Sequence, residues 1–302
     1  MIHFNCSKIL IPVDFSETSM LAIRHGAFIA QFAKSDLYLL HVVNAPFISQ
    51  NMFLPVVNLE DNSGLEKMAL AKLADLAADV KKEYGVDAKS IIKVGNPSSE
   101  VTNVAREIGA SLIVMGTHGY SPIEELVIGS VALKVITKSP CPTMAMSSGA
   151  MHKGYNKIVM PIDTTVNSRQ KVNYTLELAK KFGASVYAVG LLGTNEENEL
   201  PGMELILKQI KKLADEQHVP FQSEILKDLK NRATATVNYS EKNKADLITI
   251  MTDQDAELSG FFLGPYSQQI IHLSKIPVIA IKPKDLFVDE SNFPIPNTSG
   301  GF

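Results

Sequence analysis

The chain has 302 residues, 45% of them hydrophobic and 20% charged, and a net charge of -3. This composition is typical of a soluble globular protein, and the length suits two domains of ordinary size. The small net charge gives no electrostatic reason to expect nucleic acid or a membrane as partner, and no apolar run is long enough to span a bilayer. The first residues do not resemble a signal peptide, and Cys6 and Cys141 have no metal-binding or redox spacing. We therefore expect a cytoplasmic protein.

The first half of the chain alternates between short apolar segments and segments of helical periodicity. The pattern predicts strands at 8–14, 37–43, 89–95, 111–116 and 142–146, and helices at 17–34, 63–84, 97–109 and 130–138. Strands separated by helices indicate βαβ crossovers and a parallel sheet that helices cover on both faces. We therefore predict an α/β, Rossmann-like fold.

The second half repeats the first. Lys8–Asp14 (KILIPVD) recurs as Lys157–Asp163 (KIVMPID), and Ser111–Met115 recurs as Asp246–Ile250. Gly129 then corresponds to Gly264. The pattern predicts strands at 157–163, 185–192, 221–228, 246–251 and 277–281, so each half is expected to hold a five-stranded sheet.

The repeat divides the chain into two domains and a tail. The join is expected near Ser147–Tyr155, a stretch rich in serine and glycine, which gives domains at 1–149 and 150–283. Residues 284–302 break the pattern, and their proline, glycine, serine and asparagine content predicts an extended or disordered tail.

A glycine loop follows the fourth strand. Gly116 and Gly119 come just after a buried strand, where the backbone must turn or approach a ligand closely. Gly129 and Ser130 open the next helix and offer N–H groups and a hydroxyl that suit phosphate oxygens. Together they predict an anion cradle made of backbone dipoles.

The topology of the sheet predicts the rest of the site. In doubly wound sheets a ligand lies outside the carboxyl ends of the strands, where the strand order reverses. For the order 3-2-1-4-5 this crevice lies between the ends of strands 1 and 4, where Asp14 would accept a hydrogen bond from an amino group or hydroxyl. His41 and Val42 would flank it. An acceptor at one end and a phosphate cradle at the other predict a nucleotide site.

Structural roles compete with these assignments. Asp14 could cap the following helix, a role that Ser16 could also take. His118 fits a hydrogen-bond donor near phosphate or ribose better than a general base, because no carboxylate close to it in the sequence orients its ring. His41 fits a strand-end residue with a satisfied imidazole.

The spacing Gly116-x2-Gly119-x9-Gly129-Ser130 is specific. Together with the strand that ends in Asp14 and with Ser139–Pro142 (SPCP), it resembles the universal stress protein family. The resemblance covers both halves and implies two tandem domains of the adenine nucleotide alpha hydrolase-like fold. It also implies ATP, with Mg²⁺, as the ligand. The implied binding residues lie in the first half: Pro12, Val13, Asp14, Val42, Met115, Gly116, His118, Gly119, Gly129, Ser130 and Val131.

The second half departs from this motif. Gly116, Gly119 and Ser130 correspond to Met251, Gln254 and Pro265. Pro265 removes a hydroxyl and an N–H donor at the helix start, although proline is acceptable as a first helical residue. We expect this second site to be closed to ATP or changed to another ligand.

Three functions remain open. The first is an ATP-binding module with a regulatory or stress-response role, and the second is an enzyme with slow ATPase or adenylyl-transfer activity. The third is a nucleotide-free interaction scaffold. The sequence contains neither a Walker A motif nor a kinase glycine loop, so at most slow ATP hydrolysis is expected.

The last strand of each half predicts how the domains meet. Pro142–Met146 and Pro277–Ile281 are short and apolar, and an apolar edge strand needs a partner or a cover. The resemblance implies that family members dimerise through these strands. We therefore expect an intramolecular pseudo-dimer, with a homodimer as a further possibility.

Overall fold

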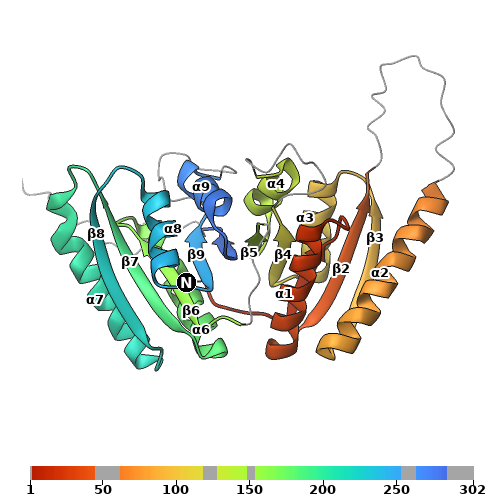
Figure 1. Ribbon diagram of the computed structural model, residues 1–302, viewed down its shortest axis with the longest axis horizontal. Helices are drawn as coiled ribbons and strands as arrows, with labels where there is room; N and C mark the ends of the chain where they lie inside the picture. Colours follow the sequence, from red (N-terminus) through yellow and green to blue (C-terminus); the bar gives the residue numbers. More distant parts are fainter. Residues whose placement is uncertain (1, 45–61, 118–127, 148–153, 253–262, 284–302) are drawn as a thin grey trace, which may run out of the picture.

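The computed structural model describes residues 2–44, 62–117, 128–147, 154–252 and 263–283. Within these ranges, ten strands form one sheet in the order β3-β2-β1-β4-β5-β10-β9-β6-β7-β8. Each half thus has the expected strand order, and every strand pair within a half is parallel. Helices cover both faces of the sheet (Figure 1). The prediction of two tandem α/β units is confirmed.

The first half agrees closely with the predicted elements. Its strands are β1 (Lys8–Pro12), β2 (Asp36–Val43), β3 (Ala88–Val94), β4 (Leu112–Gly116) and β5 (Thr143–Met146), and its helices are α1 (Glu17–Ala33), α2 (Asn62–Tyr84), α3 (Pro97–Ile108) and α4 (Ser130–Lys138). Side chains before two helices satisfy free backbone N–H groups: Ser16 caps α1 and Asn96 caps α3. β1 ends before residue 14, because the chain turns there into α1.

The second half has one change of pattern. Its strands are β6 (Lys157–Ile162), β7 (Ser185–Gly193), β8 (Phe221–Leu229), β9 (Leu247–Met251) and β10 (Val278–Ile281), and its helices are α5 (Val166–Arg169), α6 (Lys171–Phe182), α7 (Leu200–Glu216), α8 (Arg232–Lys242) and α9 (Pro265–Leu273). A short 3₁₀ helix spans Glu197–Glu199. Where the first half has the single helix α1, the second has α5 and α6, separated at Gln170.

The sheet separates two hydrophobic cores, and each core continues from one half to the other. One core lies under α1, α2, α6 and α7 and includes Ile23 and Val172. The other lies under α3, α4, α8 and α9 and includes Val104 and Ile270. The two halves therefore share continuous hydrophobic cores. Burial of apolar surface is the dominant favourable contribution to folding, so each half stabilises the other.

Strands β5 and β10 join the halves. They pair antiparallel, and Met144 lies opposite Ile279, both almost fully buried. The predicted pseudo-dimer contact between the last strands is therefore present within one chain.

Segments before β1 and β6 cross the same boundary. Phe4 N donates to Glu177 Oε2 of α6 at 2.6 Å, and Tyr155, which precedes β6, has its hydroxyl 2.8 Å from His25 Nδ1 of α1. Phe32 of α1 stacks on Phe182 of α6 with ring centroids 4.8 Å apart. Each half thus holds the entry segment of the other.

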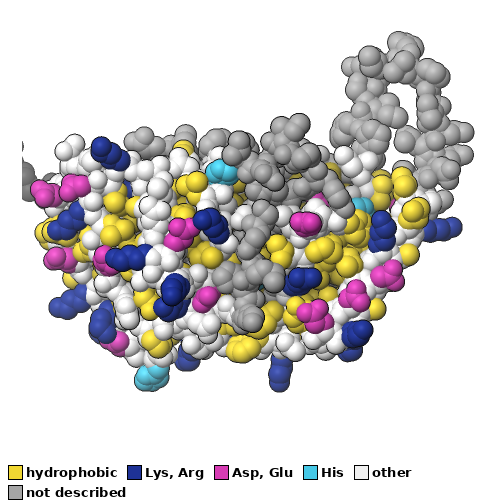
Figure 2. Space-filling model, viewed as in Figure 1, with side chains coloured by type: hydrophobic (Ala, Val, Ile, Leu, Met, Phe, Trp, Pro, Cys, Tyr) yellow, Lys and Arg dark blue, Asp and Glu magenta, His cyan; other side chains and the backbone are white. Residues whose placement is uncertain are grey.

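The surface matches the small net charge. Acidic and basic side chains are mixed over the face that Figure 2 shows, so charge of one sign does not dominate it. Among the described residues, no helix combines the length and apolarity needed to cross a membrane. The expected tail at 284–302 lies outside the described residues.

Candidate functional site

A cavity of about 270 Å³ opens in the N-terminal half at the crevice that the topology predicts. Its walls come from the carboxyl ends of β1, β2 and β4 and from the first turns of α1, α3 and α4. The predicted site residues that line it are Pro12, Val13, Asp14, Val42, Met115, Gly116, Gly129, Ser130 and Val131. The other two predicted residues, His118 and Gly119, lie outside the described residues.

Asp14 lies in the turn between β1 and α1. Its Oδ1 accepts hydrogen bonds from Ser16 N at 3.0 Å and from Ser16 Oγ at 2.5 Å. Ser16 Oγ in turn accepts from Ser19 N and so caps the helix. Asp14 therefore supports the start of α1, which agrees with the alternative role in helix capping. Its side chain is nonetheless exposed at the cavity, so the carboxylate can also meet a ligand.

His41 fixes the backbone on the floor of the cavity. Its Nδ1 lies 2.7 Å from Val13 O, which agrees with the expectation of a satisfied imidazole. Phe15 packs against the same ring, with centroids 4.7 Å apart, and has a left-handed backbone with φ 67°. These contacts hold the chain between β1 and α1 in one conformation and direct Asp14 toward the cavity.

The first turn of α4 presents free N–H groups to the cavity. The first intrahelical bond is donated by Leu133 N to Gly129 O at 3.0 Å, so the N–H groups of Ser130, Val131 and Ala132 have no acceptor within the helix. All three residues line the cavity. Such a helix start carries a partial positive charge and binds anions.

Gly129 corrects one detail of the expected cradle. Its N–H was expected to be free, but it donates to Thr117 O at 2.8 Å. A side chain at Gly129 would place Cβ 3.0 Å from the same carbonyl, and φ is -56°, so glycine is needed for space rather than for a positive φ. The anion donors therefore begin at Ser130.

Gly116 is also needed for packing. A Cβ at this position would lie 2.5 Å from Thr18 Oγ1 and 3.0 Å from the backbone carbonyl carbon of Thr18. The close approach expected here is thus made by the start of α1 rather than by a ligand alone. Because α1 approaches so closely, its first turn becomes a wall of the cavity.

The sequence interpretation missed several wall residues. Thr18 and Ser19 come from α1, Pro97 and Val101 from α3, and Thr117 follows β4. For Thr18, Ser19, Pro97 and Val101, the signal available in the sequence was their place near the start of the helices that follow β1 and β3. Helix starts and strand ends meet at the same edge of a parallel α/β sheet.

Larger side chains stand at the corresponding positions of the C-terminal half. Met251, fully buried, stands where Gly116 stands in the first half. Tyr266 replaces Val131, and its hydroxyl lies 3.1 Å from Thr236 Oγ1. Pro265 begins α9 and removes one N–H donor from its first turn. Asp163 keeps the turn of Asp14, but it is buried, with 8% of its surface exposed.

Two titratable side chains belong to the described lining of the N-terminal cavity. They are Asp14, which accepts a hydrogen bond from Ser16 N, and His41, whose Nδ1 lies within hydrogen-bond distance of Val13 O. Across the described part of the chain, no group of three or more histidine, cysteine, aspartate or glutamate side chains could hold a metal ion. The residues that fit a bound anion are the helix start of α4 and the hydroxyl of Ser130.

Comparison with known proteins gives one family. The model of the universal stress protein family matches the chain twice, over residues 5–146 and 154–282. A universal stress protein of Methanocaldococcus jannaschii is 32% identical over 151 residues, which cover 46% of this chain and 93% of that protein.

Two further proteins match both halves at once. A universal stress protein of Mycobacterium bovis is 24% identical over 293 residues, covering 91% of this chain and 96% of that protein. The solved structure of a universal stress protein from Archaeoglobus fulgidus superposes with a TM-score of 0.72 at 18% identity, covering 94% of this chain and 98% of that one. The second similarity shows that the tandem fold is shared.

Proposed function

Because the chain belongs to the universal stress protein family, whose model matches it twice in tandem, we propose that its N-terminal domain binds ATP and that the protein is a nucleotide-dependent regulatory module. The observation that carries this proposal is the first turn of α4. Three N–H groups without intrahelical acceptors line a cavity at the switch point of the sheet. That arrangement suits the phosphates of a nucleotide.

The rest of the cavity supports the assignment to a nucleoside. The exposed Asp14 carboxylate also lines it and would accept a hydrogen bond from ribose or base, and its apolar lining residues include Val42 and Val101. A mostly apolar pocket with a few convergent polar groups is typical of small-molecule sites. Ser130, Val131 and Ala132 would hold the phosphate end, where Mg²⁺ would neutralise phosphate charge.

Slow ATP hydrolysis is the second candidate activity, and a nucleotide-free scaffold is the third. Both described titratable groups of the cavity already bond to their own backbone or helix cap, which supports binding without rapid turnover. His118, the other titratable residue of the expected site, lies outside the described residues. Regulatory nucleotide binding is therefore the function that the described residues support best.

Analysis of the bound small molecule tests the proposal. One sample of the purified protein is denatured, and the released molecules are identified by mass spectrometry. A second, folded sample is incubated with ATP and assayed for ATP turnover. We expect an adenine nucleotide and turnover far slower than that of metabolic ATPases. Absence of any adenine nucleotide, both after purification and after incubation with ATP, would favour the scaffold. Rapid turnover would favour the enzyme.

A further inference from the structure

The C-terminal crevice contains an ion pair at the place that corresponds to the N-terminal cavity. The caps of α3 and α8 fix this correspondence: Asn96 Oδ1 accepts from Ser99 N, and Asn231 Oδ1 accepts from Thr234 N. The next residue is Pro97 in the first half, where it lines the cavity, and Arg232 in the second. Arg232 therefore extends from the wall of the crevice.

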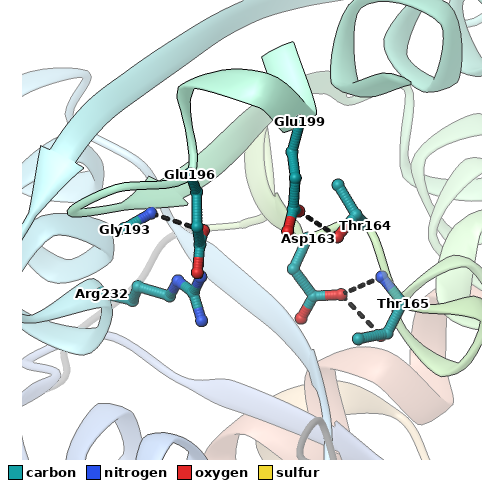
Figure 3. A network of polar contacts seen from close by, with 7 residues as sticks. All are labelled: Asp163, Thr164, Thr165, Gly193, Glu196, Glu199 and Arg232. Carbon is teal, nitrogen blue, oxygen red and sulfur yellow. Dashed lines mark hydrogen bonds and ion pairs between the residues drawn. The ribbon is translucent and has the colours of Figure 1, made fainter. Parts of the chain in front are cut away.

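The partner of Arg232 is Glu196, from the loop that follows β7. Both carboxylate oxygens of Glu196 contact Arg232 Nη2, and Gly193 N donates to Glu196 Oε2 at 2.7 Å. Figure 3 shows the three residues converging from the end of β7, the loop and the start of α8. A guanidinium together with a backbone N–H is a typical receptor for a carboxylate.

Gly193 is needed for this receptor. A Cβ at Gly193 would lie 3.1 Å from Glu196 Oε1 and 3.3 Å from Arg232 Nη2, so the carboxylate reaches the backbone because no side chain is present. Partial burial would raise the pKa of Glu196, but the Gly193 N–H and the Arg232 guanidinium outweigh it and hold that pKa below its usual value. The pair is half-buried, with 36% of Arg232 and 29% of Glu196 exposed.

Two more carboxylates lie beside the receptor. Glu199 Oε2 accepts from Thr164 Oγ1 at 2.6 Å, and Asp163 Oδ1 accepts from Thr165 N at 2.9 Å (Figure 3). They make the surroundings unfavourable for a polyanion such as a nucleoside triphosphate. A single carboxylate suits this place, and Glu196 supplies it.

We propose that the C-terminal domain contains a carboxylate-binding site, formed by Gly193 N–H and Arg232, which its own Glu196 occupies and thereby closes. The ligand class of the opened site is a small carboxylate such as acetate. Glu196 acts as a tethered ligand, and its attachment to the chain gives it a high effective concentration at the receptor. This inference is independent of ATP binding in the N-terminal domain.

Chemical rescue tests the site. Thermal midpoints of the full chain, Glu196→Ala and the double variant Glu196→Ala/Arg232→Ala are measured without nucleotide in sodium acetate and in sodium chloride of equal ionic strength. We expect acetate to raise the midpoint of Glu196→Ala by a few degrees and to saturate, because a ligand that binds only the folded state stabilises it. For the wild-type chain and for the double variant, the thermal midpoint in sodium acetate should equal that in sodium chloride. An equal acetate response in all three proteins, or none in Glu196→Ala, would overturn the proposal.

A second measurement uses the wild-type chain alone, so it does not depend on whether a variant folds. The amide resonance of Gly193 should shift as the pH is lowered and Glu196 becomes protonated, with an apparent pKa below that of an ordinary glutamate. A Gly193 resonance that does not move through this range would also overturn the proposal. ATP titration of the same sample reports on the N-terminal site separately.

Discussion

Ser130 and Pro265 occupy the same helix position in the two halves and give a direct exchange experiment. Ser130→Pro removes a hydroxyl and one of the three free N–H groups of α4 but leaves a residue that helix starts accept. A hydrogen bond to a charged group contributes about 1.5–3 kcal/mol, so we expect ATP to bind on the order of tenfold or more weakly by calorimetry. The matched control, Pro265→Ser, should change neither affinity nor stoichiometry. Unchanged affinity in Ser130→Pro would remove the helix start from the site.

Asp14 combines a helix-capping role with a proposed ligand role, and the second half again supplies the control. Asp14→Asn keeps an oxygen for Ser16 but removes the charge and two acceptor lone pairs that the exposed side of the carboxylate offers. We expect a smaller ratio of ATP to GTP affinity, measured by competition, with a melting temperature close to that of the wild type. Asp163→Asn alters the equivalent turn and should leave the ratio unchanged. If both variants keep the wild-type ratio, Asp14 has only its capping role.

We expect Lys171 to make the stability of the protein depend on pH. It is fully buried on α6, and its Nζ donates to Ser168 O at 2.7 Å and to Ser168 Oγ at 3.0 Å. Burial lowers its pKa from 10.5 to about 7, and the nearby Asp163 carboxylate opposes that shift. Below about pH 7 the amine is charged in both the folded and the unfolded chain, so folding bears the full free-energy cost of burying a charged amine.

Between pH 7 and 10.5 the unfolded chain binds more protons at Lys171 than the folded chain does. The free energy of unfolding therefore gains up to about 1.4 kcal/mol per pH unit from this residue as the pH rises. Lys171→Met removes the penalty, so it should stabilise the protein most near pH 7 and progressively less toward pH 9.5. Denaturant unfolding of both proteins across this range measures the difference. A difference that does not change with pH would mean that the amine keeps its ordinary pKa.

At the scale of elements, the pairing of β5 with β10 carries the clearest prediction. Met144 and Ile279 lie opposite one another, with 1% and 0% of their surfaces exposed. Met144→Asp would bury an unpaired carboxylate, which costs several kcal/mol, and would expose an apolar strand to intermolecular pairing. We expect a large fall in melting temperature, with aggregation. Val94→Asp, at the exposed end of β3, is the matched control and should change stability by less than about 0.5 kcal/mol. Equal effects of the two substitutions would show that the β5–β10 contact is not needed.

The elements also show what sequence reasoning can and cannot reach. Apolar periodicity predicted the strands to within a few residues, and topology then located the cavity, because helix starts and strand ends meet at one edge of such a sheet. The sequence could not show that Gly129 N donates to Thr117 O, that Gly116 packs against Thr18, or that Glu196 pairs with Arg232. These contacts join residues that are distant in the sequence or lie in loops, where no periodicity exists. The second half has two helices, α5 and α6, where the first half has α1, and comparison of the two repeats did not predict this break.

At the scale of the molecule, the two halves form one structure with unequal sites. The shared sheet, the two continuous cores and the exchanged entry segments hold the halves together. One half has an open cavity, and in the other half larger or charged residues such as Met251, Tyr266 and Arg232 stand at the positions that correspond to its lining. The C-terminal half completes the sheet edge of the N-terminal half, because β10 pairs with β5. Nucleotide binding on one side alone would make the pseudo-dimer asymmetric.

Calorimetric titration of the protein with ATP and Mg²⁺ tests most directly whether the chain has one nucleotide site, in its N-terminal domain. Nucleotide is first removed, and protein concentration is measured independently, so that the stoichiometry is absolute. We predict a single binding event with close to one ATP per chain, which Ser130→Pro weakens and Pro265→Ser leaves unchanged. Two ATP molecules per chain, or no binding at all, would contradict this account.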